Sequence, residues 1–68
     1  MSQKYQLSQK IKSKETEFQH LSSEIGQLAI KHYQDRSPAT EELMHSKIEK
    51  ALQIETEIQN LNQKVGLE

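Results

Sequence analysis

The sequence predicts an all-α fold in which two long helices pack as an antiparallel, coiled-coil-like hairpin. Apolar residues recur at alternating steps of three and four in both halves of the 68-residue chain. The only proline, Pro38, separates these halves, and most residues within each half are good helix formers. We therefore expect one chain to fold back on itself at this proline, and two such hairpins to form a four-helix bundle.

The apolar residues of each half define one stripe, and the two stripes match in register. When the halves are paired antiparallel, the numbers of facing positions sum to 72, as for 7 with 65, 18 with 54 and 28 with 44. Such matching is expected where two helices pack along a common seam. The predicted seam residues are Leu7, Ile11, Phe18, Leu21, Ile25, Leu28, Met44, Ala51, Ile54, Ile58, Leu61 and Val65.

Two lysines occupy positions within these stripes. They are either charges that recognise a partner or structural residues whose aliphatic stems pack along the seam and fix its register. We favour the structural interpretation. In the antiparallel register Lys14 faces Ile58 and is expected to reach Glu55, while Lys47 faces Ile25.

The helices are predicted over about 3–33 and 38–65, joined by a turn at 34–37. Ser37 is a favourable N-cap, and Pro38 suits the first helical position, where its missing N–H is not needed.

The second helix is expected to stop at Gly66, so that 1–66 form a single domain. Leu67 and Glu68 match the junction left by a C-terminal affinity-tag vector, and we interpret them as an expression-tag remnant. The alternative is a native chain end.

A second small-residue pattern lies in the first helix. Ser22, Gly26 and Ala29 follow one another at steps of four and three. This spacing favours close packing of another helix, and a hinge at Gly26 is the alternative.

The composition limits the size of any core and the choice of partner. With 32% hydrophobic and 4% aromatic residues and no cysteine, the chain has little material for a thick core and no disulfide to stabilise it. The net charge of −1 gives no general affinity for nucleic acid or anionic lipid, although segment 1–14 carries four lysines and no acid. We therefore expect stabilisation by association, as a homodimer.

No catalytic, cofactor or metal site is expected. The sequence has one Asp, no Cys and no Gly-rich loop, and two extended helices do not enclose a pocket. His32 and His45 flank the turn, whereas His20 lies far from it. The three histidines are therefore not expected to converge on one zinc ion. No apolar run approaches membrane-spanning length and no signal peptide is evident, so a cytoplasmic location is expected.

Several apolar residues lie outside the seam. One hairpin does not cover them, so they are candidates for a dimer surface near the turn. They are Ala29, Ile30, Tyr33, Leu43, Ile48 and Leu52.

The stretch Glu-Ile-Gly-Gln-Leu-Ala-Ile-Lys-His-Tyr at 24–33 resembles the end of the first helix in small, uncharacterised zinc-ribbon proteins of Gram-positive bacteria, whose ribbon is joined to a helical hairpin. The chain has no Cys-x-x-Cys, so the ribbon itself is absent. The resemblance implies a bacterial helical interaction module with no catalytic residue. The matching positions are Ile25, Gly26, Leu28, Tyr33, Asp35, Pro38, Ile48, Ile54, Ile58, Leu61 and Gly66.

The sequence therefore favours a non-enzymatic hairpin that mediates protein–protein contact and oligomerisation. One alternative is an adaptor that binds nucleic acid or an anionic surface through the lysines of 1–14. Another is a holdase-like coiled-coil scaffold that grips unfolded clients. The partner protein is not specified by the sequence.

Overall fold

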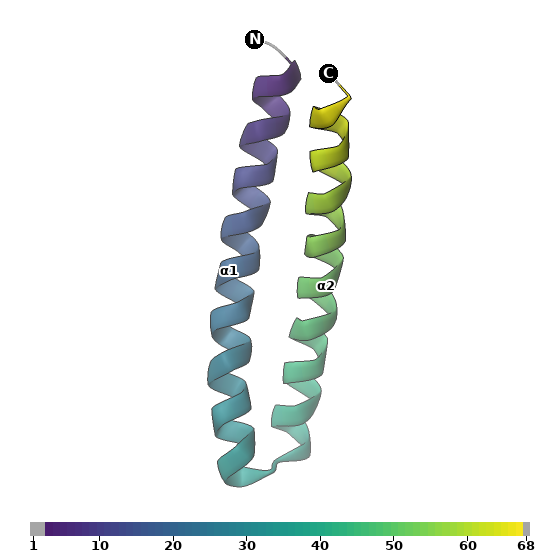
Figure 1. Cartoon of the computed structure of the whole chain (residues 1–68). Helices are drawn as coiled ribbons and strands as arrows, with labels where there is room; N and C mark the ends of the chain where they lie inside the picture. The colour runs from purple at the N-terminus through teal and green to yellow at the C-terminus, as the bar shows by residue number, and fades with distance from the viewer. Residues whose placement is uncertain (1–2, 68) are drawn as a thin grey trace.

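The computed structural model describes residues 3–67 and contains two antiparallel helices, which confirms the predicted hairpin. Helix α1 spans Gln3–Asp35 and helix α2 spans Pro38–Gly66. They lie side by side along their lengths, with both chain ends at the same end of the hairpin (Figure 1). The molecule is a narrow rod whose Cα atoms extend over 50 × 14 × 13 Å.

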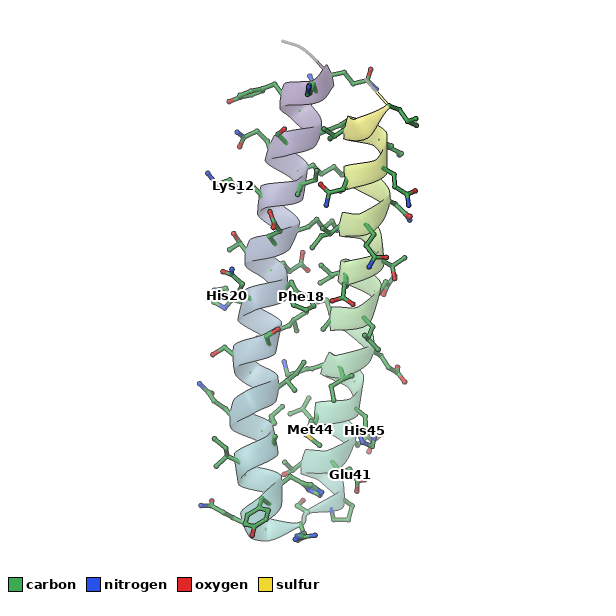
Figure 2. All side chains as sticks on the ribbon, viewed as in Figure 1. Lys12, Phe18, His20, Glu41, Met44 and His45 are labelled. Carbon is green, nitrogen blue, oxygen red and sulfur yellow. The ribbon has the colours of Figure 1, made fainter. Side chains whose placement is uncertain are left out.

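The seam between the helices contains the core. Leu21, Ala51 and Ile54 form its buried centre, with Phe18 and Ile58 among the partly buried residues packed against them. In Figure 2, Phe18 points from α1 toward α2. Each of the twelve residues predicted for the seam is buried or half-buried, namely Leu7, Ile11, Phe18, Leu21, Ile25, Leu28, Met44, Ala51, Ile54, Ile58, Leu61 and Val65.

The connection between the helices is shorter than the predicted turn at 34–37. Helix α1 continues to Asp35, which leaves two residues before Pro38. Arg36 adopts a left-handed conformation with φ 56°, and its N–H donates to the His32 carbonyl over 2.7 Å. This conformation ends a helix, but glycine is the usual residue there, so an arginine does not predict it.

Helix α2 begins as predicted. Ser37 is the N-cap, and its hydroxyl oxygen accepts a hydrogen bond from the Thr40 N–H at 3.5 Å. The Ser37 N–H in turn donates to Asp35 Oδ1 over 3.0 Å. Pro38 occupies the first turn, where no N–H is required.

Helix α2 extends one residue beyond the predicted end at 65. Gly66 is helical and has no positive φ, so the helix does not end through a left-handed glycine. Instead, the Leu67 N–H donates to the carbonyls of Gln63 and Lys64, each over 3.2 Å. The proposed tag remnant begins at this exposed Leu67, and Glu68 lies outside the described residues.

Helix α1 passes through Gly26 without a break. A Cβ atom added at Gly26 would meet no atom within 4 Å. Helix α2 is therefore not the helix that the small residues were expected to pack against, and this part of α1 is open to the outside.

Candidate interaction surface

Two interhelical ion pairs lie on one side of the seam, which we call the ion-pair flank. Lys14 Nζ lies 2.6 Å from Glu57 Oε2, and Lys47 Nζ lies 2.6 Å from Glu24 Oε2. Both lysines are half-buried, and each links one helix to the other. This arrangement agrees with the structural interpretation of the two seam lysines.

The predicted partner of Lys14 was wrong. Its ammonium group pairs with Glu57, not Glu55. The two glutamates are separated by about 200° around α2 at 3.6 residues per turn. Glu55 consequently lies on the other side of the seam, where it lines a groove with Glu15.

The ion pairs affect the pKa values of two groups in opposite directions. The hydrogen bond and the charge of Glu57 raise the pKa of the Lys14 ammonium above its ordinary value. The hydrogen bond and the charge of Lys47 lower the pKa of the Glu24 carboxyl. Each shift favours the charged form that the pair requires.

An open groove of about 410 Å³ lies on the ion-pair flank. Leu43 contributes its side chain to this groove and is 49% exposed. The other lining residues are Glu24, Gln27, Leu28, Lys31 and Lys47. Leu43 is thus placed among charged side chains.

The opposite side of the seam carries the apolar flank, which we define as Ala29, Tyr33, Ile48 and Leu52. Ile48 follows Leu43 by five residues, which places the two about 140° apart around α2. Leu52 is 57% exposed and Tyr33 is 76% exposed. The open surface at Gly26 adjoins Ala29 and Tyr33, because residues three and seven positions apart share a helix face.

The six residues expected to form one dimer surface are therefore divided. Four belong to the apolar flank, whereas Leu43 lies on the ion-pair flank. Ile30, which is exposed, lies on the side of α1 away from the seam, since it is five residues from Ile25 and two from Leu28.

A second groove, of about 220 Å³, lies on the same side of the seam as the apolar flank but farther from the turn. Half-buried Phe18 and Ile58 supply its apolar surface, and Glu15 and Glu55 line it from the two helices together with Gln19. Neither glutamate forms an ion pair within residues 3–67.

The turn end of the seam is polar, and one of its two residues, Thr40, was not predicted to lie there. Thr40 is buried, and it faces His32 in the same register, since 32 and 40 sum to 72. Nδ1 of His32 is shielded from solvent and has no hydrogen-bond partner in the described part of the chain. The step of four from Thr40 to Met44 continues the period of the seam, but threonine is not an apolar residue.

The other histidines lie on the outside of the hairpin. His20 points away from α2, and His45 lies beside Glu41 on α2, with Nε2 4.0 Å from Oε1 (Figure 2). Over the described range 3–67, no three His, Asp or Glu side chains converge as metal ligands would.

Fold and surface together define an antiparallel helical hairpin with one charged and one apolar flank. Neither helix, over the residues described, has an apolar stretch long enough to cross a bilayer. The chain matches no protein-family model, no curated protein and no solved structure. The resemblance to the hairpin of zinc-ribbon proteins stays a prediction.

Proposed function

We propose that this chain is a non-enzymatic interaction module that associates with a second copy of itself through the apolar flank, to form a four-helix bundle. The observation that carries the proposal is the exposure of Tyr33 and Leu52 on the same flank as Ala29 and half-buried Ile48. Full burial of a large apolar side chain contributes about 1.5–3 kcal/mol, and twofold symmetry would bury each of these residues twice.

The small core of the single hairpin also supports association. The chain exposes 5276 Å², whereas a compact monomer of its mass is expected to expose about 4,400 Å². A hairpin that leaves this much surface in water gains little hydrophobic stabilisation on its own. Contact with a second hairpin along one flank would supply part of the missing hydrophobic stabilisation.

The open surface of α1 suits a closely packed helix. Ser22, Gly26 and Ala29 have small side chains, so they would allow a neighbouring backbone to approach α1. The lack of any neighbour within 4 Å of a Cβ at Gly26 leaves this space available.

The test compares two matched substitutions on α2. Leu52→Glu introduces a charge on the apolar flank, and Leu43→Glu introduces the same charge on the ion-pair flank at similar exposure. Sedimentation equilibrium should give a mass near twice 7.9 kDa for the wild type and for Leu43→Glu. Leu52→Glu should give the monomer mass, and circular dichroism should show whether that monomer stays helical.

Equal masses for the two variants would contradict the assignment of the interface to the apolar flank. A wild-type mass near 7.9 kDa at micromolar concentration, with full helical content, would contradict self-association itself.

A further inference from the structure

The groove on the side of the apolar flank has a charge that the hairpin leaves unmatched. Glu15 and Glu55 come from opposite helices to the same groove, with Phe18 and Ile58 between them. Both side chains are acidic, and no cation pairs with either glutamate in residues 3–67. On the ion-pair flank, by contrast, Glu24 and Glu57 each have a lysine partner. The groove therefore suits an amphipathic group with a positive charge.

The turn of the same chain presents such a group. The guanidinium carbon of Arg36 lies 5.5 Å from the centre of the Tyr33 ring. Arg36 is exposed, and so is the ring on which its guanidinium rests. Arginine is well suited to pair with carboxylates, because its planar group offers several N–H donors. Tyr33 and Arg36 together provide an aromatic surface beside a cation.

The spacing along the rod relates these two features. Arg36 is 21 residues from Glu15 and 19 residues from Glu55. At 1.5 Å per residue, the groove lies about 30 Å from the turn. Gly26 and Ile48 are 10 and 12 residues from Arg36, and so lie about midway, at roughly 15–18 Å from the turn.

We propose that the second copy packs antiparallel to the first, with the twofold axis near Gly26 and Ile48, and that the Tyr33–Arg36 pair of each protomer docks in the Glu15–Glu55 groove of the other. This inference rests on the proposed self-association and adds its orientation. A parallel arrangement would instead place the two Arg36 side chains at the same end and leave both grooves unmatched.

A charge exchange tests this contact. Arg36→Glu alone and the double variant Glu15→Lys/Glu55→Lys should each raise the dimer dissociation constant by about tenfold or more, because both ends of the dimer then oppose like charges. Mixing the two variants should restore dimerisation, since the heterodimer has one native and one exchanged contact. Glu42→Lys/Glu49→Lys, which makes the same charge change on exposed glutamates elsewhere on α2, should not associate preferentially with Arg36→Glu.

Spin labels give an independent measure of orientation. A single cysteine placed at Asn60, 24 residues from Arg36, carries the label in a chain that has no other cysteine. In the antiparallel dimer the two labels are separated by about 40 Å along the rod. In a parallel dimer they lie level with one another, within about 25 Å, or roughly two helix diameters.

The possible outcomes separate this inference from the proposed function. Rescue in the mixture together with the long label distance would support the antiparallel contact. If Leu52→Glu dissociates the dimer but the exchanged variants fail to prefer each other, or if the label distance is short, the orientation is overturned and self-association stands. A monomeric wild type overturns both.

Discussion

Lys47 of α2 and Glu24 of α1 form an ion pair across the seam, with Nζ 2.6 Å from Oε2. Lys47 faces Ile25 in the seam, so the pair joins the charged flank to the core. Lys14 and Glu57 repeat the arrangement with the helices exchanged, since each lysine reaches a glutamate on the facing helix. The two seam lysines thus pack their stems in the core and place their charges on one flank.

The stability of the hairpin should depend on pH through the Glu24–Lys47 pair. The pKa of the Glu24 carboxyl is lowered in the folded state, so its contribution is present above the unfolded pKa of about 4.3. It is lost as the pH falls through the lower folded value. Urea unfolding between pH 2 and 7 should therefore show a smaller acid-induced loss of stability for Glu24→Gln than for wild type.

Glu49→Gln provides the control for that experiment, because Glu49 is exposed and has no ion pair among residues 3–67. The contribution of Lys14 has the opposite sign: its raised pKa means that stability is lost as the pH rises through the folded value, above about pH 10.4. Identical acid profiles for Glu24→Gln and wild type would show that the pair contributes nothing in solution.

Ile54 is the most sensitive position in the core. Its side chain is 3% exposed and packs with Leu21 and Ala51. Ile54→Ala should cost about 2–5 kcal/mol, which is comparable with the whole stability expected of a domain this small. Thermal unfolding followed by circular dichroism should show loss of most helical signal at 25 °C. Ile30→Ala, at an exposed position of α1, should change stability by less than about 0.5 kcal/mol, and similar costs for both would contradict the placement of the core.

His32 leaves a polar atom without a partner at the turn end of the seam. Replacing a buried, unsatisfied polar group by an apolar one of similar size removes its desolvation cost. His32→Leu should therefore stabilise the hairpin by about 1 kcal/mol, which corresponds to a rise of about 4–8 °C in Tm. The comparison needs equal protein concentrations, because association also raises Tm. A lower Tm for the variant would show that Nδ1 has a favourable partner.

The seam was accessible from the sequence because its signal is repeated. Every turn of both helices contributes to the same period, and the constant sum of facing numbers fixes the register. The cap at Ser37 was likewise accessible, since a serine before a proline has a local physical reason to start a helix.

Features that depend on a single residue or on the side of the seam were harder to predict. Arg36 ends α1 in a left-handed conformation, which a glycine at this position would have predicted and an arginine does not. The sequence places Lys14 opposite Ile58, but the predicted partner, Glu55, and the observed partner, Glu57, lie on different sides of α2. Leu43 is as close to the turn as the residues of the apolar flank, but its direction around α2 places it on the ion-pair flank.

The most direct measurement is the molar mass of the wild-type chain by sedimentation equilibrium, over a concentration series that spans the micromolar range. We expect a reversible approach to twice 7.9 kDa, with helical content that rises as the dimer forms. A fully helical species that stays at 7.9 kDa throughout the series would contradict it, since the apolar flank would then remain in water at no cost to the fold.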